Sequence, residues 1–509
     1  MPKIITFTVT NNSTFINETL DKEVRDALKK KLGFMPEGAA FAVANSKFGN
    51  SDWDGHKSVM CLGKRWCKCA IKKDGVHFPT GLIHIAREFL EKKGYVVKYV
   101  DNRIKIKINE NLKYEHIIEL RPYQRVAVDK AKKMQRGILK MATGAGKTAS
   151  SAALIVELNA YPFIFYVPSL DLLNQTKEEF ERFIKFNGED AKIGMVGGGE
   201  CDIQDITVMT QQTAMRALGK GFVKSDEDSK KEKDSENVKN KYNDIKNLIM
   251  SAKGMIADEV QFWAAESCQM ISDSAENCFY KYGCSGTPYR DLGDDILIEA
   301  CFGRVIEDIN ASKLINLDFL VRPDIYMVPV KNKYGTLKSH TYQEVYKEAI
   351  VENNLRNGYI SKITQSMVQQ DKMTLILVRQ INHGKILEEL IPGSCFISGT
   401  SSKKKRKDHI QAMKNHEAPV TISTSIFDQG VDVKPLQVLI QAGSGKSPTR
   451  ALQRIGRIIR PYEYPDGTKK TEAIAIDFMD HCRYMLGHSK KRLKIYQTEP
   501  EFNIETLKI

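Results

Sequence analysis

One stretch of the chain suits the binding of a nucleotide phosphate, Ala142-Thr-Gly-Ala-Gly-Lys-Thr148, which follows the largely apolar segment 138–141. Glycines let consecutive backbone N–H groups point at one anion, and a helix N-terminus adds partial positive charge. Lys147 would then reach the β- and γ-phosphates of ATP, and the Thr148 hydroxyl would hold Mg²⁺. The cradle itself would consist of Thr143, Gly144, Ala145 and Gly146.

A second stretch, Ala442-Gly-Ser-Gly-Lys-Ser447, has nearly the same pattern and also follows an apolar segment. In both stretches the first glycine of the full P-loop pattern is missing. The residues that follow each stretch distinguish the two. The acidic pair Asp258-Glu259 comes after the first, whereas the arginine-rich segment 453–460 comes directly after the second. We therefore expect ATP at the first stretch and assign Lys446 only as a candidate DNA contact.

The acidic pair ends a strand-like segment, 254–258. An Asp at a strand end beside a P-loop can hold Mg²⁺ through water, and a neighbouring Glu can orient and deprotonate the attacking water. The hydroxyl-rich turn 285–287 follows a further strand and could hydrogen-bond this pair. Gln124 precedes an amphipathic helix, and its amide can both donate to and accept from an adenine edge.

Other residues have chemistry suited to phosphates. Arg457 and Arg460 are three apart, which would place both on one helical face, where guanidinium groups could stabilise charge on the γ-phosphate. Gly198 is the middle of three glycines that would let a phosphate backbone approach closely. Thr210 ends a strand-like segment, 206–210, ahead of a polar turn. Trp53 could stack on a base or wedge a duplex, or could anchor its own turn.

The composition limits the function classes. The chain has 509 residues, 42% of them hydrophobic and 28% charged, with a formal net charge of +14, which favours a polyanionic partner. No apolar run approaches the ~20 residues of a membrane span, and the N-terminus lacks the apolar core of a signal peptide. The ten cysteines are scattered, as in a reducing cytosol. The spacing of Cys61, Cys67 and Cys69 fits no common zinc pattern, so free or buried thiols are expected.

We expect an α/β fold with three parts. Residues 1–115 form a small α/β accessory DNA-binding domain, with a helix at 22–32 and strands that include 104–108, where Ile and Lys alternate. Residues 116–312 form an ATP-binding domain with a highly charged insertion at 222–247. Residues 313–509 form a second domain of the same class. Both units have continuous apolar segments separated by helical ones, the pattern of doubly wound parallel sheets.

Taken together, these residues resemble the motifs of superfamily 2 helicases, in that family's order. The resemblance covers roughly residues 118–480, and its matching segments are 121–124 for the adenine motif, 142–148 for motif I, 169–175 for Ia, 258–261 for II, 285–287 for III, Thr424 with 430–432 for V, and 453–460 for VI. It implies two tandem RecA-like domains, which would move on DNA by hydrolysing ATP with Mg²⁺.

The resemblance also implies roles for single residues. Those implied in catalysis are Lys147, Asp258, Glu259, Gln261, Arg457 and Arg460. Those implied in ATP binding, besides the P-loop, are Arg121, Gln124, Gly430, Asp432 and Gln453. Those implied in DNA contact are Ser169, Thr210 and Thr424, beside Trp53, Gly198 and Lys446.

Within the superfamily the chain is most similar to phage recombination helicases of the UvsW type, and more distantly to XPB-type repair helicases. The similarity includes Trp53-Asp54-Gly55 and the segment 78–82. One departure is Gln261, where the UvsW-type family usually carries His. The resemblance implies branch migration, fork regression and unwinding of D-loops or RNA–DNA hybrids, in the cytoplasm of a host cell. The alternatives are an RNA helicase, a motor subunit of a restriction complex, or a nucleotide-gated DNA-binding scaffold.

Overall fold

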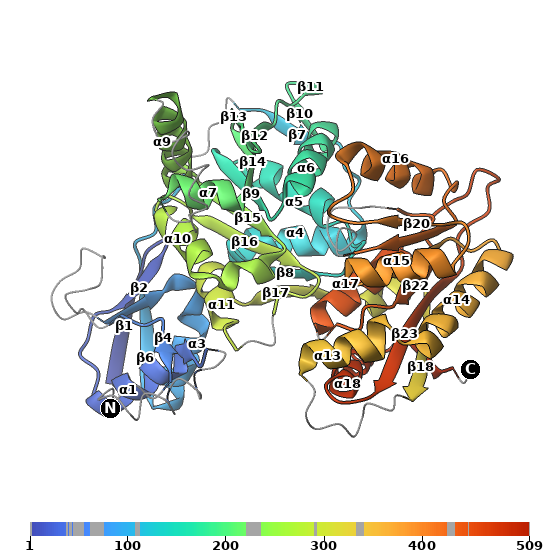
Figure 1. The fold of residues 1–509 in the computed structure, drawn as a ribbon. Coiled ribbons are helices and arrows are strands. Elements are labelled where there is room, and N and C mark those ends of the chain that lie inside the picture. The colour runs from blue at the N-terminus through green and yellow to red at the C-terminus, as the bar shows by residue number, and fades with distance from the viewer. Residues whose placement is uncertain are drawn as a thin grey trace. The chain divides into compact units, whose positions relative to one another are not determined.

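The computed structural model describes residues 3–36, 39, 43, 55–61, 76–106, 112–219, 236–289, 293–331, 341–424, 433–445 and 447–507. The chain divides into two compact units. The first contains residues 1–141 and 146–308, and the second contains residues 142–145 and 309–509. Figure 1 shows the helices and strands of both.

The first unit begins with a small sheet in the order β5-β2-β1-β6. Its strands are β1 (Lys3–Val9), β2 (Ser13–Ile16), β5 (Val76–Pro79) and β6 (Tyr95–Asp101). The helical segments of this region are α1 (Lys22–Lys31), η1 (Thr80–Leu82) and α3 (Ile83–Lys92), and β3 (Gly33–Phe34) pairs with β4 (Lys57–Ser58). The core between sheet and helices includes Phe7, Leu28, Phe78 and Leu90, all fully buried. The helix predicted at 22–32 is therefore confirmed as α1.

The strand predicted at 104–108 is wrong for its described residues, 104–106, which lie in no strand. Its apolar face is not buried either, since Ile104 is 48% exposed. The parallel pairing of β1 with β6 ends at Val9 and Asp101, so β1 does not continue beside residue 104. An alternating pattern forms a strand only where another strand offers hydrogen bonds.

The larger sheet of the first unit has the order β13-β12-β14-β9-β15-β16-β8-β17. Its strands are β8 (Arg136–Met141), β9 (Phe163–Val167), β12 (Gly194–Gly197), β13 (Glu200–Asp202), β14 (Ile206–Thr210), β15 (Gly254–Asp258), β16 (Tyr280–Ser285) and β17 (Val305–Ile309). The helical segments are α4 (Pro122–Met134), α5 (Lys147–Leu158), α6 (Leu170–Phe183), α7 (Gln211–Ala217), α9 (Glu236–Ser251), η2 (Val260–Ala264), α10 (Glu266–Ser274) and α11 (Ile296–Phe302). The strands from β12 to β8 pair in parallel. All residues of β9 are buried, as a strand covered on both faces requires.

Two smaller features complete this unit. A three-stranded sheet combines β7 (Tyr114–His116), β10 (Ile184–Phe186) and β11 (Glu189–Asp190). The charged segment 222–247 lies partly outside the described residues, and its described end belongs to α9. Ile245 on that helix is fully buried, together with Leu248 and Ile249, which lie just beyond the segment. The end of the segment therefore packs on the core and is not wholly solvated.

The second unit contains an all-parallel sheet in the order β20-β21-β19-β22-β23-β18-β24. Its strands are β18 (Pro323–Lys331), β19 (Thr374–Leu377), β20 (Ser394–Ile397), β21 (Val420–Ser423), β22 (Val438–Gln441), β23 (Ala473–His481) and β24 (Asn503–Thr506). The helical segments are α12 (Ala311–Ile315), α13 (Tyr342–Tyr346), η4 (Lys347–Val351), α14 (Asn354–Gln369), α15 (Ile381–Leu390), α16 (Lys403–Lys414), α17 (Pro448–Ile458) and α18 (Met485–Tyr496). Two doubly wound α/β sheets are thus present, as the sequence predicts.

Candidate nucleotide and nucleic-acid sites

The predicted P-loop joins β8 to α5. Gly144 and Gly146 have φ values of 88° and 78°, in the left-handed region that favours glycine. Gly146 is the N-cap of α5 and has no side chain to offer as a cap, so a bound anion can take that role. A side-chain carbon at Gly146 would also overlap the amide nitrogen of Gln124. The P-loop and the predicted adenine motif are therefore in contact.

Gln124 is held in place by its own helix start. Its Oε1 accepts a hydrogen bond from the Arg121 backbone N–H at 2.9 Å, at the start of α4. Arg121 in turn donates to the Tyr123 hydroxyl at 3.1 Å. Gln124 is buried, with its amide nitrogen against Gly146, so its side chain lies directly beside the P-loop.

The acidic pair lies at the end of β15 and faces the P-loop lysine. The Nζ atom of Lys147 is 3.7 Å from Oε1 of Glu259. Burial, and secondarily the negative charge of Glu259, raise the pKa of Asp258 to about 7. Glu259 has a left-handed backbone, with φ 49°, which is uncommon for a residue with a side chain. The structure thus brings together Lys147, Asp258 and Glu259, as predicted.

A chain of hydrogen bonds links the acidic pair to the turn after β16. Gln261 Nε2 donates to Glu259 Oε2 at 2.6 Å, and Ser285 Oγ donates to Gln261 Oε1 at 2.7 Å. The Thr287 backbone N–H then donates to Ser285 Oγ at 3.0 Å. The predicted hydrogen bonding between this turn and the acidic pair is confirmed. Gln261 makes both contacts because an amide carries one donor group and one acceptor group.

The residues around Asp258 also fit a magnesium ion. In the part of the chain that the structure describes, no group of three or more His, Cys, Asp or Glu side chains could hold a metal. Asp258 Oδ1 is nevertheless buried without a hydrogen-bond partner. Mg²⁺ in nucleotide sites takes most of its ligands from phosphate and water and only one or two from the protein. Asp258 and the Thr148 hydroxyl would hold such an ion, which would neutralise charge on the phosphates.

Three predicted DNA contacts lie at the carboxyl ends of adjacent strands. Ser169 follows β9, Gly198 follows β12 and Thr210 ends β14, and these strands are neighbours in the sheet. Ser169 caps α6 through the Leu172 N–H, and Thr210 caps α7 through the Thr213 N–H. Gly198 has φ 62°. The N–H groups of these helix starts that the caps leave unbonded, together with the glycine turn, are features that can bind phosphate at one edge of the sheet.

In the second unit, Gln453 and Arg457 lie on α17, but Arg460 does not. The helix ends at Ile458 with Ile459 as its C-cap, so the prediction that both arginines share one helical face is wrong. Thr424 follows β21 directly. Trp53, Gly430, Asp432 and Lys446 lie outside the described residues, as do Cys67 and Cys69.

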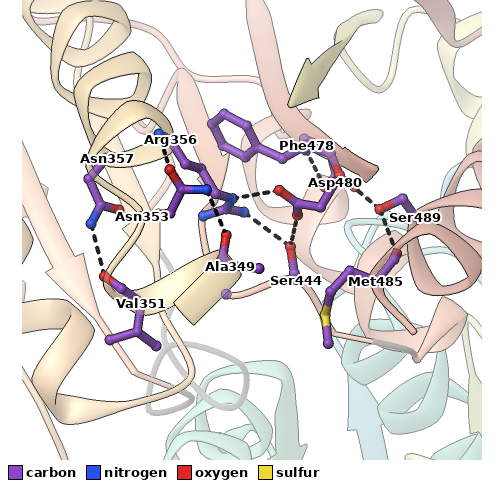
Figure 2. Close-up of polar contacts among 12 residues, drawn as sticks. Ala349, Val351, Asn353, Arg356, Asn357, Ser444, Phe478, Asp480, Met485 and Ser489 are labelled. Carbon is purple, nitrogen blue, oxygen red and sulfur yellow. Dashed lines mark hydrogen bonds and ion pairs between the residues drawn. The ribbon is translucent and has the colours of Figure 1, made fainter. Parts of the chain in front are cut away.

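The P-loop-like stretch after β22 is held by side chains of its own unit, as Figure 2 shows in part. Arg356 NH2 donates to Ser444 Oγ at 3.0 Å, and Ser444 Oγ donates to Asp480 Oδ2 at 2.7 Å. Arg492 NH1 donates to the Gly445 carbonyl at 2.6 Å. The guanidinium groups of Arg356 and Arg492 thus hold the serine hydroxyl and one carbonyl of this loop in place. They support the choice of the other stretch as the ATP site.

Two buried ion pairs behind this loop were not foreseen from the sequence. Arg356 pairs with Asp480 at 2.9 Å, and Arg492 pairs with Asp477 at 2.7 Å. The available signal was the pair of aspartates in the otherwise apolar segment 473–480, because a carboxylate in a buried strand needs a buried cation. Arg492 also belongs to a chain of polar contacts around Asp477. The Tyr496 hydroxyl donates to Asp477 Oδ2 at 2.8 Å, Gln441 Nε2 donates to the Tyr496 hydroxyl, and Arg454 of α17 donates to Gln441 Oε1 at 3.4 Å.

Comparison with known proteins assigns both units. Residues 117–290 match the family model described as "Type III restriction enzyme, res subunit", and residues 357–462 match "Helicase conserved C-terminal domain". The ATP-dependent DNA helicase uvsW of Enterobacteria phage T4 is 24% identical over 94% of each chain. The DNA 3'-5' translocase XPB2 of Sulfurisphaera tokodaii is 26% identical over 71% of this chain and 82% of its own.

A solved structure supports the fold. A fragment of a putative HsdR subunit of a type I restriction enzyme from Vibrio vulnificus has a TM-score of 0.53 and 15% identity, and the match covers 79% of this chain and 71% of that one. No helix among the described residues is long and apolar enough to cross a membrane. The two family models, the relatives of this chain and the P-loop with its acidic pair identify the chain as an ATP-dependent DNA helicase of superfamily 2, with two tandem RecA-like domains preceded by a small α/β accessory domain.

Proposed function

We propose that this helicase acts on branched DNA in recombination, replication and repair, where it drives branch migration, fork regression and the unwinding of D-loops and RNA–DNA hybrids in the cytoplasm of a host cell. The observation that carries this proposal is the packing of the accessory domain against the first helicase domain. A motor that bears a rigid extension can hold one arm of a junction while it moves along another.

The two domains of the first unit share buried surface. Ala300, on α11 of the helicase domain, lies in the core of the accessory domain. A side-chain carbon at Gly81 would overlap the Glu299 carbonyl, so the two backbones are in direct contact. His84 also contacts the Glu299 carboxylate at 3.0 Å. The accessory domain therefore packs as part of this unit and not as a loosely tethered module.

Buried polar contacts strengthen this packing. Lys281 is fully buried, and its Nζ donates to Asn12 Oδ1 in the turn between β1 and β2 at 2.6 Å. Burial lowers the pKa of Lys281 to about 8. Arg136 donates to the Asn11 carbonyl of the same turn. Removal of the accessory domain would leave both cations without these acceptors, which is costly inside a protein.

A cleft of about 710 Å³ lies where the accessory and helicase domains meet. Among its lining residues are five cations, Arg87, Arg103, Lys133, Arg136 and Arg304, against three carboxylates, Glu88, Glu91 and Asp101. Arg87 and Arg103 pair with carboxylates within the cleft, whereas Lys133 and Arg304 are exposed at it. Exposed cations beside a rigid extension suit contact with the phosphates of a duplex arm.

The cycle would depend on the residues described above. Lys147 and the P-loop would bind the phosphates, Gln124 the adenine, and Glu259 the attacking water. Arg457, Arg460 and the motif V residues would complete the site when the two units close on ATP. Ser169, Gly198, Thr210 and Thr424 would hold the strand by its backbone, independent of sequence.

The test compares the double variant Lys133→Glu/Arg304→Glu with the control Lys29→Glu/Lys30→Glu, which makes the same charge changes on α1, away from the cleft. We expect the first variant to lose fork regression by more than it loses ATP turnover on single-stranded DNA. When the logarithm of its duplex-binding constant is plotted against the logarithm of the salt concentration, the slope should be smaller in magnitude by about two. Equal fork regression by the two variants would contradict the role of the cleft.

Two other functions are distinguished by substrate. The match described as a restriction res subunit covers only the first motor domain, so it favours a restriction motor only if a partner supplies cleavage. An RNA helicase would be stimulated by RNA. ATP turnover measured with branched DNA, linear DNA and RNA decides among them, and we expect the strongest stimulation from branched DNA.

A further inference from the structure

A strained turn at the carboxyl end of β23 presents an aromatic ring to solvent. The Met485 N–H donates to the Arg483 carbonyl at 2.8 Å, across Tyr484, whose φ and ψ are 64° and −47°. This is a γ-turn with positive φ, a rare and strained conformation for a residue with a side chain. The Tyr484 side chain is 37% exposed. Backbone strain of this kind concentrates at functional sites.

Other aromatic and cationic groups surround this ring. The Tyr342 ring lies 5.8 Å from the Tyr484 ring, edge to face, and the Arg483 guanidinium lies 4.8 Å from the centre of the Tyr484 ring. Arg379 donates to the Tyr342 hydroxyl at 2.9 Å, and the His488 ring lies 5.8 Å from the Tyr342 ring. We call these five residues the Tyr484 platform.

The turn cannot easily relax, because both of its flanks are fixed. Asp480, shortly before the turn, is fully buried and paired with Arg356. Met485, directly after it, is fully buried, and Ser489 on the same helix donates to the Phe478 carbonyl at 3.0 Å. Figure 2 shows Met485 and Ser489 beside Phe478 and Asp480. The backbone that carries the ring is therefore fixed before any ligand arrives, which reduces the entropy lost on binding.

The platform lies at the edge of the sheet where ligands of such folds bind. The strands β21, β19, β22 and β23 are neighbours and run parallel, so their carboxyl ends meet at one edge. Arg379 follows β19, Tyr484 follows β23, and the predicted DNA contact Thr424 follows β21. In doubly wound sheets, ligands bind outside this edge.

We propose that the Tyr484 platform binds single-stranded DNA by stacking an unpaired base on the Tyr484 ring, with Arg379 and Arg483 beside the adjoining phosphates. The proposal rests on the proposed action on DNA and adds a specific base contact to it. Aromatic rings among cations are the usual means of binding single strands, and they tolerate every base because each has a flat π-face. Bases inside a duplex are already stacked, so the platform selects the separated strand.

The test separates the ring from the backbone. Tyr484→Gly removes the ring and suits the positive φ, so its melting temperature should not fall because of strain. Tyr484→Phe keeps the ring. With an oligothymidylate that carries one 2-aminopurine, we expect Tyr484→Gly to bind roughly tenfold more weakly, at low and high salt alike, and to lose the quenching that stacking causes. Tyr484→Phe should bind and quench as the wild type does.

The matched control is Leu390→Ala. Leu390 is 42% exposed and ends α15, the helix that follows β19 and returns to the opposite edge of the sheet. This variant loses exposed apolar surface without touching the platform, and its DNA affinity should not change. If Tyr484→Gly binds and quenches like the wild type, the platform does not stack a base. If instead the wild type shows no DNA-stimulated ATP turnover, it is the proposed function that fails.

Discussion

Gln261 offers a direct probe of how ATP hydrolysis responds to DNA, because it bridges the acidic pair and the Ser285 turn. Gln261→Leu keeps nearly the same shape and removes both hydrogen bonds. A bond to a charged group contributes about 1.5–3 kcal/mol and a neutral one about 0.5–1.5 kcal/mol. If both act in the transition state, their loss of about 2–4.5 kcal/mol lowers turnover by roughly 30- to 2,000-fold.

The assay is steady-state ATP turnover with and without single-stranded DNA, together with a melting curve. We expect the DNA-stimulated rate of Gln261→Leu to fall by that factor. The control is Gln269→Leu, which also removes a glutamine with two contacts, from its Nε2 to the Trp263 and Leu297 carbonyls at 2.8 Å each. That variant should lose stability and keep DNA stimulation. Wild-type stimulation in Gln261→Leu would refute the reasoning.

Three further predictions concern the motor. Lys147→Ala should abolish ATP turnover while DNA binding measured by anisotropy largely survives, whereas Lys446→Ala should keep turnover. Turnover that survives in Lys147→Ala and is lost in Lys446→Ala would instead assign the ATP site to the stretch 442–447. Arg457→Ala and Arg460→Ala should each lower turnover by roughly 10³-fold if they act as arginine fingers, and near-normal rates in both would contradict closure of the two units. Arg356→Ala should lower the free energy of unfolding by about 3–5 kcal/mol, because it leaves its aspartate partner buried and unpaired, and an unchanged denaturant midpoint would contradict this.

The strand ends that carry the chemistry could be predicted from the sequence. A few consecutive residues, an apolar segment followed by Gly-Lys-Thr or by Asp-Glu, are enough to recognise each of them. The strand predicted at 104–108 failed over its described residues, 104–106, since a strand depends on a neighbour and the pairing of β1 has already ended there. The helical face assigned to Arg460 failed since α17 ends two residues earlier. The first failure depends on tertiary surroundings, whereas the second had a local signal, because Pro461 disfavours a helical conformation at Arg460.

The long-range contacts were harder to predict from the sequence. Asn11 and Asn12 resemble ordinary turn residues, and nothing near them indicates that they accept hydrogen bonds from Arg136 and Lys281. Tyr484 has no sequence signal for positive φ, because such a conformation is usually marked by Gly or Asn. These features arise where distant segments meet, so they appear only in the folded chain.

The most direct test of the central claim is the rate of ATP-dependent fork regression by the wild type and by Glu259→Gln. Glu259→Gln keeps the shape of the side chain and removes the base that would activate water. We expect the wild type to regress forks with ATP, and Glu259→Gln to bind Mg-ATP and forked DNA but convert none of it. Fork regression by Glu259→Gln at the wild-type rate, or a wild type that hydrolyses ATP on DNA yet leaves every fork and junction unchanged, would contradict the claim.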